Sequence, residues 1–261
     1  MRIVRFKTEK NVRYGKLENG IINPIEGDIF DDFTVTEQEI SQEDVILLAP
    51  VNPPNIFAIG LNYQKHAKES GQSLPERPLI FIKATSSLAG PEDSIILPEM
   101  APDEVDYEAE LAIVVGRKAK NVSVEDTDHY ILGYTCANDV SARDCQRRLD
   151  KQWARAKSFD TFCPLGPWIE TQLNKPDNCP IRSRLNGTVM QDSNTSDLIF
   201  DTRQLFSYLS KNFTLYPGTV IMTGTPEGVG FARKPAVFLK SGDIIEIEIE
   251  GIGTLRNHVI R

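Results

Sequence analysis

One stretch, residues 105–115, constrains the fold more than any other, because it alternates carboxylates with apolar side chains and then becomes wholly apolar. Successive side chains on a β-strand point to opposite faces, so Glu108 and Glu110 share a face with Ala112 and Val114. A face that runs from carboxylates into apolar residues is expected to enter the protein interior. The sequence therefore predicts a strand that carries buried carboxylates.

A second stretch, residues 245–250, shows the same alternation of isoleucine and glutamate, but its polar face is charged throughout. That pattern is typical of a strand with one face on the core and the other in water. Buried carboxylates are different, since isolated buried charge costs several kcal/mol or more. Glu108 and Glu110 must share a proton or bind a cation, and Mg²⁺, which takes oxygen ligands, is the natural partner. A pair of surface glutamates on an edge strand is the alternative.

Composition excludes several classes of protein. The chain has 261 residues and a formal net charge of -8, which argues against a nucleic-acid partner. No apolar run approaches the roughly 18 residues of a membrane helix, and the N-terminus lacks the apolar core of a signal peptide, so we expect a cytoplasmic protein. The three histidines and four scattered cysteines support neither a histidine-rich zinc site nor a disulfide framework.

The chain is expected to form two domains. Short strands are predicted at residues 2–7, 12–17 and 20–23, and the proline-rich segment 49–54 can continue neither a helix nor a central strand. This predicts a small N-terminal β domain, residues 1–52, and a larger domain, residues 53–261.

Three polar residues in the larger domain are candidates for chemistry. A helix is predicted to follow Asn62 as its cap, and on it His66 and Glu69 stand three residues apart, close enough to touch. A histidine held by a carboxylate can act as a general base, although a solvated pair is the commoner explanation. Asp139 ends a strand predicted at 134–138, where it can be a third oxygen ligand or cap a helix predicted from Ser141.

Four further segments have patterns that predict a local structure or a ligand. Asn186-Gly187 predicts a β-hairpin turn, and Asp201 is placed to cap a helix. The basic segment 143–157 could bind a small anion or form a solvated face. The glycine-rich segment 223–230 is expected to offer backbone N–H groups to a ligand carboxylate.

Taken together, five ordered motifs resemble the fumarylacetoacetate hydrolase superfamily over residues 55–259. They are Gly-Leu-Asn-Tyr-Gln-Lys-His at 60–66, Asp-Tyr-Glu-Ala-Glu-Leu at 106–111, Asn-Asp-Val-Ser-Ala-Arg-Asp at 138–144, Ala-Lys-Ser-Phe-Asp at 156–160 and Thr-Gly-Thr-Pro at 223–226. Segments 157–167 and 238–243 look closest to the branch called fumarylacetoacetate hydrolase domain-containing protein 2.

The resemblance implies a mixed α+β, mostly β fold, with a β-roll catalytic domain that usually forms homodimers. It implies that Glu108, Glu110 and Asp139 bind Mg²⁺ or Mn²⁺. It makes His66 and Glu69 an acid/base dyad and Lys157 a positive group near the reacting oxygens. Family members contact substrate at positions that match Arg143, Gln146 and Thr225. The variable segment 69–76 leaves the substrate open.

A divalent-metal-dependent enzyme of small 2-oxo or β-diketo acids is the leading hypothesis. Such an acid can chelate the metal through its carboxylate and keto oxygens, which stabilises an enolate. Oxaloacetate and acylpyruvates are suitable substrates, by C–C hydrolysis, decarboxylation or keto–enol tautomerisation, and the branch favours oxaloacetate tautomerisation. The alternatives are an isomerase of hydroxymuconate-type dicarboxylates and a non-catalytic metal-binding homologue. A zinc or cysteine hydrolase is weaker, because nothing in the sequence activates Cys136 or Cys163.

Overall fold

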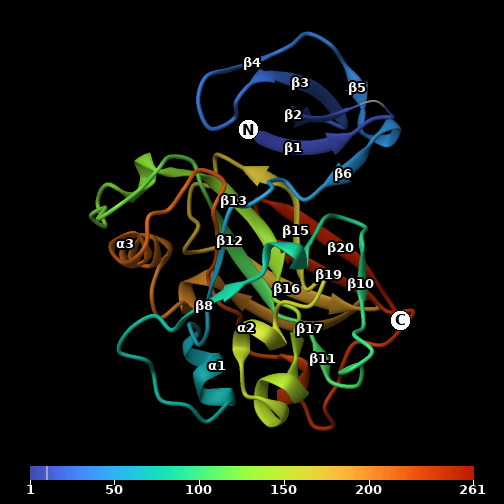
Figure 1. Cartoon of the computed structure of the whole chain (residues 1–261), viewed down its shortest axis with the longest axis vertical. Coiled ribbons are helices and arrows are strands. Elements are labelled where there is room, and N and C mark those ends of the chain that lie inside the picture. The colour runs from blue at the N-terminus through green and yellow to red at the C-terminus, as the bar shows by residue number, and fades with distance from the viewer. Residues whose placement is uncertain (10) are drawn as a thin grey trace.

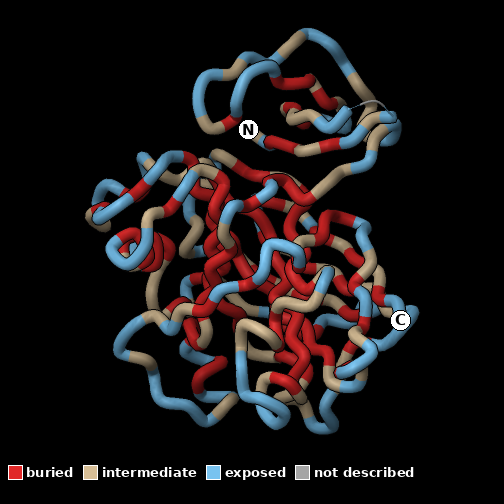
Figure 2. The backbone as a smooth tube through the Cα atoms, in the orientation of Figure 1, coloured by how far each residue is buried: buried red, intermediate tan, exposed pale blue. Residues whose placement is uncertain are grey.

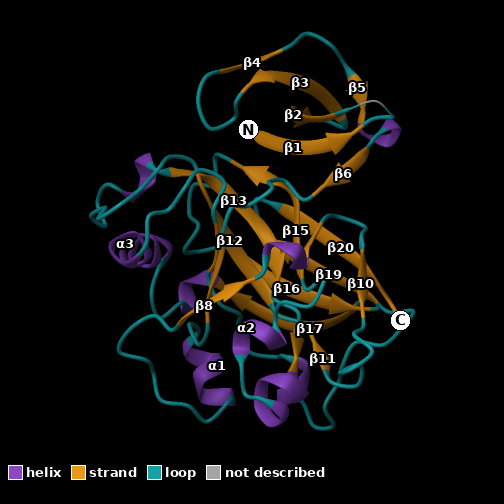
Figure 3. Cartoon of the chain, viewed as in Figure 1, coloured by secondary structure: helices purple, strands orange, loops and turns teal. Residues whose placement is uncertain are grey.

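The computed structural model describes residues 1–9 and 11–261, and within them β-structure dominates (Figure 3). The N-terminal strands lie together at one end of the molecule (Figure 1). Their bounds are β1 (Arg2–Lys7), β2 (Val12–Glu18), β3 (Ile21–Gly27), β4 (Phe33–Val35), β5 (Ile40–Ser41) and β6 (Ile46–Leu48), with a 3-10 turn, η1 (Gln42–Asp44). The strands predicted at 2–7, 12–17 and 20–23 are therefore present, the last one displaced toward residue 27.

Two groups of strands build the rest of the chain. The larger group comprises β7 (Ile56–Ile59), β8 (Ile80–Lys83), β9 (Leu88–Ala89), β12 (Ala109–Val115), β13 (Ile131–Asn138), β15 (Cys163–Glu170) and β18 (Val220–Met222). The smaller group comprises β10 (Ser94–Ile96), β16 (Pro180–Leu185), β17 (Thr188–Asn194), β19 (Ile244–Ile249) and β20 (Gly253–Ile260). A short ladder joins β11 (Val105–Asp106) to β14 (Ser141–Ala142).

The helices are few and short. They are α1 (Gln64–Glu69), α2 (Trp153–Ala156) and α3 (Thr202–Asn212), with a π-helical turn, η4 (Cys145–Leu149), and 3-10 turns η2 (Thr85–Ser87), η3 (Thr127–His129), η5 (Thr195–Asp197) and η6 (Gly230–Ala232). α1 and α2 lie at the end of the molecule away from the N-terminal strands (Figure 3). Among the described residues, no helix combines the length and the apolar character that crossing a membrane requires.

The large sheet runs through both parts of the chain. Its main path is β4-β3-β2-β1-β15-β13-β12-β18-β7-β8, and the two parts join where β1 pairs with β15 through Ile3 and Ile169. The smaller sheet has the order β10-β20-β19-β16-β17. The domain boundary that we propose near residue 52 falls between β6 and β7.

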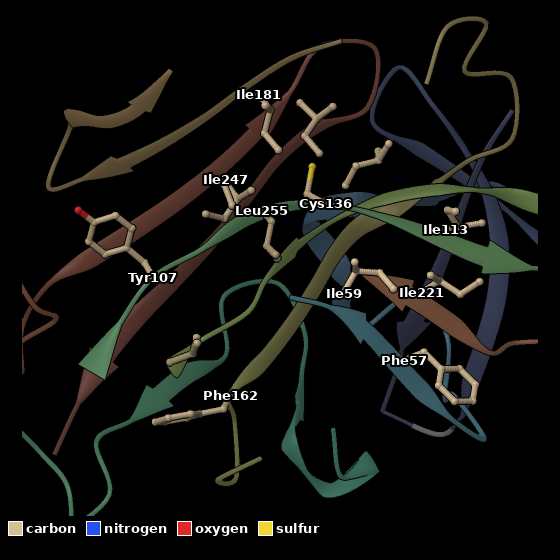
Figure 4. Close-up of a cluster of buried hydrophobic side chains, with 14 of the residues drawn as sticks. Phe57, Ile59, Tyr107, Ile113, Cys136, Phe162, Ile181, Ile221, Ile247 and Leu255 are labelled. Atoms are coloured by element: carbon tan, nitrogen blue, oxygen red, sulfur yellow. The ribbon is translucent and has the colours of Figure 1, made fainter. Parts of the chain in front are cut away.

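The main core lies between the two sheets, where the backbone is buried (Figures 2 and 4). Ile113 on β12 and Ile221 on β18 come from the large sheet, and Ile247 on β19 and Leu255 on β20 come from the small one. These side chains belong to one buried cluster. The predicted mixed α+β, mostly β fold is confirmed.

The two faces of β12 pack into different clusters. Leu111 and Ile113 belong to the core between the sheets, whereas Ala112 and Val114 pack on the opposite side with Phe81 and Met222. All seven residues of β12 are buried, because each face of the strand packs into one of these clusters and β13 and β18 flank it. The carboxylate face of this strand therefore does enter the protein, as the sequence predicts.

Local signals fixed two other elements as expected. Asn186 and Gly187 have φ angles of 51° and 79°, the left-handed values that a two-residue hairpin turn requires. Asp201 caps α3 and, with Gln204, forms a capping box.

One predicted helix cap and one predicted helix start were wrong. Asn62 does not cap α1, because its side chain instead bonds the backbone of Phe200 and Thr223. The helix predicted from Ser141 is displaced, since Ser141 pairs with Asp106 in a strand and the helical turn η4 begins at Cys145.

Candidate functional site

Three carboxylates meet where β12 begins. Each of Glu108, Glu110 and Asp139 offers one oxygen, and these oxygens lie within 4.8 Å of one another. The backbone sets this arrangement, because the Asp139 N–H donates to the Glu108 carbonyl (2.9 Å) and the Glu108 N–H donates to Asn138 Oδ1 (3.0 Å). The sequence-predicted ligand set thus comes together from β12 and the end of β13, and all three side chains are buried.

Basic side chains surround Glu108. Arg143 Nη2 donates to one of its oxygens (2.6 Å) and Lys157 Nζ to the other (2.8 Å). Burial alone would raise the pKa of Glu108, but Lys157 and Arg143 outweigh burial and hold it at about 2. Glu108 is therefore a stable anion at neutral pH.

Asp139 lies between two lysines. Lys83, at the end of β8, donates to Asp139 Oδ1, and Lys157 donates to Asp139 Oδ2. Lys83 also donates to the Phe162 carbonyl (2.9 Å) and is almost fully buried. Burial would lower the pKa of Lys157, but Asp139 and Glu108 raise it. Both lysines therefore neutralise carboxylate charge inside the protein.

Glu110 has no such compensation. Its Oε2 accepts from the Gly224 N–H (2.8 Å), whereas its Oε1 is buried without a hydrogen-bond partner among the described residues. Burial, with the charges of Asp139 and Glu108, raises the pKa of Glu110 well above its usual value. A buried carboxylate oxygen that lacks a donor, beside two further carboxylates, is a chemical fit for a hard divalent cation.

The glycine-rich segment 223–230 binds carboxylates of the chain itself. Gly224 donates to Glu110, Gly228 donates to Glu69 (3.0 Å), and Gly230 donates to Asp106 (2.7 Å). The expectation that this segment receives a ligand carboxylate was wrong for these three N–H groups. Gly224 and Gly228 have φ angles of 100° and 96°, which explains why glycine is required there.

His66 and Glu69 are in contact on α1. His66 Nδ1 lies 3.1 Å from Glu69 Oε2, and Glu69 also accepts from Gly228, so the carboxylate is held from two sides. The histidine is buried apart from a small fraction of its surface. The arrangement fixes the imidazole, and within residues 1–9 and 11–261 no hydrogen bond engages Nε2, which can therefore contact a ligand.

A cavity of about 180 Å³ joins these groups. That volume is below the roughly 300 Å³ at which pockets for drug-sized ligands begin, so it suits a small molecule. Its walls include two predicted catalytic residues, His66 and Lys157, but not the third, Glu69. They also include one candidate metal ligand, Glu108, and the three predicted substrate contacts, Arg143, Gln146 and Thr225.

The three predicted substrate contacts also have partners within the protein. Arg143 donates to Asp106 Oδ2 (2.9 Å) and Glu108, and it donates to Gln146 Oε1 (2.8 Å). Thr225 Oγ1 accepts from Gln191 Nε2 (2.8 Å). Arg143 and Lys157, at the two ends of the basic segment 143–157, are buried in ion pairs. These two residues therefore neither form a solvated face nor stand free to bind an anion.

Sequence reasoning missed Lys83 and the structural role of Asp106. Asp106 accepts from Arg143 and from the N–H groups of Gly230 and Phe231, so it ties the glycine-rich segment to the site. Lys83 shares a face of β8 with the buried Phe81, two residues earlier. That period of two was a signal that the lysine points inward.

Two packed β-sheets, a buried carboxylate trio and a histidine–glutamate pair beside one small cavity together form an arrangement typical of a small-molecule enzyme. The chain belongs to the fumarylacetoacetate hydrolase family: the model of the fumarylacetoacetate (FAA) hydrolase C-terminal domain matches residues 55–260. Residues 1–50 match a second model, described as Rv2993c-like, N-terminal.

Relatives and solved structures agree with this membership. The chain is 48% identical over 237 residues to the fumarylacetoacetate hydrolase domain-containing protein 2 homolog of Dictyostelium discoideum, covering 86% of this chain and 77% of the relative. It is 46% identical to the mitochondrial oxaloacetate tautomerase FAHD2A of Homo sapiens, covering 85% and 71%. The structure of 5-carboxymethyl-2-hydroxymuconate delta-isomerase from Mycobacterium smegmatis matches with a TM-score of 0.91 and 43% identity over the full length of both chains.

Proposed function

We propose that this protein is a divalent-metal-dependent enzyme of small 2-oxo or β-diketo acids and that its leading reaction is keto–enol tautomerisation of oxaloacetate. One observation carries the proposal: a buried carboxylate trio with one unsatisfied oxygen lies beside the cavity that His66 also lines. The names of several relatives, among them the FAHD2A protein of Homo sapiens, describe oxaloacetate tautomerases and support the choice of reaction.

Glu108, Glu110 and Asp139 would hold the cation, Mg²⁺ or Mn²⁺. Their donor set is all oxygen, and Glu110 Oε1 lacks any other partner among the described residues, as a ligand atom for a hard cation should. When bound, such an ion stabilises negative charge that develops on a substrate oxygen.

His66 is the proposed acid/base. In the keto-to-enol direction its Nε2 would take a proton from the carbon beside the 2-oxo group and then return it to the 2-oxo oxygen, so that the histidine ends the step in its starting state. Glu69, through Nδ1, would hold the imidazole ring and stabilise its charged form. Lys157 would add positive charge near the reacting oxygens, and Arg143, Gln146 and Thr225 would contact the substrate.

Two other functions have support of a more limited kind. An isomerase of hydroxymuconate-type dicarboxylates is favoured by the name of the Mycobacterium smegmatis structure, and that reaction also moves a proton beside a carbonyl. Decarboxylation or C–C hydrolysis would use the same groups. A non-catalytic metal-binding homologue is opposed by the contact between His66 and Glu69.

Tautomerase activity can be tested with freshly dissolved oxaloacetate and Mg²⁺, following the ultraviolet absorbance of the enol and, in parallel, the release of CO₂. The proposal expects the approach to keto–enol equilibrium to accelerate, with loss of activity on chelation. If absorbance changes only as fast as CO₂ appears, the enzyme is a decarboxylase. If neither rate exceeds the uncatalysed rate while metal is bound, the proposed function is wrong.

We also propose that the working form is a homodimer, as the family resemblance implies. Light scattering coupled to size-exclusion chromatography tests this, with a mass near twice 29.3 kDa expected and a mass of one chain contradicting it.

A further inference from the structure

Arg147 stands out among the cations that line the site cavity. It lies on the π-helical turn η4, one turn beyond Arg143, and it is exposed. Within residues 1–9 and 11–261 it forms no ion pair or hydrogen bond. Its guanidinium packs over the Phe231 ring, with 4.4 Å between the guanidinium carbon and the ring centroid. A free cation in the wall of a small cavity is available to a ligand.

The other two long cationic side chains of the cavity are already neutralised. Arg143 is shared between Asp106 and Glu108, and Lys157 is shared between Glu108 and Asp139. Bringing a second carboxylate of a substrate into the cavity would therefore leave that charge without a counterion, unless Arg147 supplies it.

Phe231 holds the Arg147 guanidinium in place. The Phe231 N–H donates to Asp106 Oδ2 (3.1 Å), and Arg143 packs on the same ring at 4.5 Å, so the ring is fixed to the buried charge network. Stacking on a ring occupies a face of the guanidinium but leaves its N–H edge free for a carboxylate. Gln146 lies beside it, with its Oε1 bonded to Arg143 and its amide N–H₂ left to donate.

We propose that Arg147 binds the distal carboxylate of the substrate and so selects 2-oxo dicarboxylates over 2-oxo acids with a neutral tail. This rests on the proposed function, which places the 2-oxo carboxylate end of the substrate at the carboxylate trio. The cavity of about 180 Å³ has room for a short dicarboxylate such as oxaloacetate but not for a long acyl chain.

The first test compares two substrates in Arg147→Gln. Oxaloacetate carries the distal carboxylate, and acetylpyruvate carries a neutral acetyl group in its place. The ratio of kcat/KM for oxaloacetate to that for acetylpyruvate should fall by about 10–100-fold, as expected for losing one hydrogen-bonded charge pair, and the fall should lie in KM. Arg147→Lys should recover part of the ratio.

Arg148→Gln is the matched control. Arg148 is the adjacent residue on the same turn, but it pairs with Glu104 and does not line the cavity. It should leave the substrate ratio within about twofold of wild type, because exposed ion pairs contribute little. A ratio that is unchanged in Arg147→Gln, or that falls equally in Arg148→Gln, overturns the proposal.

A binding measurement separates this proposal from the proposed function. Calorimetry with Mg²⁺ would compare 3,3-difluoro-oxaloacetate, a dicarboxylate that cannot enolise, with pyruvate, which has the same 2-oxo acid end and no tail. Arg147→Gln should weaken the binding of difluoro-oxaloacetate at least about tenfold more than the binding of pyruvate. That result without any turnover in wild type would sustain the Arg147 subsite and reject the tautomerase. If wild type turns over oxaloacetate but Arg147→Gln weakens the binding of both ligands equally, the tautomerase is sustained and the Arg147 subsite is rejected.

Discussion

β12 with its preceding residues and β19 both carry glutamates at every second position, yet the glutamates have opposite environments. Glu108 and Glu110 are buried, whereas Glu246 and Glu248 are half-buried and Glu250 is exposed. Both strands have neighbours on each side. The difference is that β12 packs apolar residues on both of its faces, whereas β19 buries only its isoleucines.

The two sets of glutamates also differ in how their charge is balanced. In the site, cations from three separate elements, Lys83, Arg143 and Lys157, are buried against the carboxylates. On β19 the side chains of the Arg184–Glu248 pair are 34% exposed for the glutamate and 27% for the arginine. We propose that the buried charge of the site serves binding and chemistry, while the β19 charges keep one face of a sheet in water.

The largest expected effect is that of Glu110→Gln on turnover. This change keeps the shape of the side chain but removes the charge that completes the proposed cation site. Turnover of oxaloacetate should fall by about 10⁴-fold, because each 1.36 kcal/mol of lost charge stabilisation costs tenfold and a bound cation contributes several kcal/mol. Glu248→Gln is the control and should retain wild-type turnover. Equal activity of the two variants would remove the distinction between the two strands.

His66→Asn should have the next largest effect. Turnover should fall by about 10³-fold, since general acid/base catalysis contributes 10²–10⁴-fold, while divalent-metal affinity stays at the wild-type value. The pair of measurements, kinetics and Mn²⁺ affinity, distinguishes His66 from Glu110. Loss of metal in His66→Asn would mean that the histidine is part of the cation site.

Lys83→Met tests the buried charge network through stability. Removing Lys83 leaves buried Asp139 with Lys157, which Glu108 shares, as its remaining ion-pair partner among the described residues, so the free energy of unfolding in chelator should fall by about 3 kcal/mol. Urea denaturation followed by circular dichroism measures it.

Arg184→Met provides the matched control in the small sheet. Because the Arg184–Glu248 pair is partly exposed, its loss should cost at most about 1 kcal/mol. A cost for Arg184→Met that equals the cost for Lys83→Met would contradict the assignment of different environments.

A smaller difference between Glu108 and Glu248 is expected in how the free energy of unfolding depends on pH. Because the pKa of Glu108 is lowered in the folded protein, its charged form stabilises the fold at pH values above its ordinary pKa. This contribution, about 3 kcal/mol in total, is lost as the pH falls from about 4.5 toward 2. Glu110, whose pKa is raised by burial and by the charges of Asp139 and Glu108, acts in the opposite direction, and Glu108→Gln lessens this opposing contribution without removing it. Unfolding free energies of wild type and Glu108→Gln between pH 5.5 and 3 should therefore differ in slope. A slope change of the same size in Glu248→Gln would refute the explanation.

Much of the site could be predicted because its signals are local in sequence. The period of two along residues 105–115, the spacing of His66 and Glu69, and Asp139 at a strand end each refer to a single element. The hairpin at Asn186-Gly187 and the cap at Asp201 are equally local. These predictions needed no knowledge of which elements pack together.

The rest could not be predicted because it depends on contacts between distant segments. Lys83 meets Asp139 across 56 positions, and Gly230 meets Asp106 across 124. Asn62 looked like a helix cap, but its side chain bonds Phe200, 138 positions away. For Asn62, a tertiary partner replaced the local one that the sequence suggests.

The most direct test of the account is the binding of Mn²⁺ to the carboxylate trio, measured by electron paramagnetic resonance of the free ion during titration. Wild type and Glu248→Gln should each bind one Mn²⁺ per chain, and Glu110→Gln should lose that site. Absence of a site in wild type, or a site that survives Glu110→Gln unchanged, would contradict the claim that buried glutamates hold the cation.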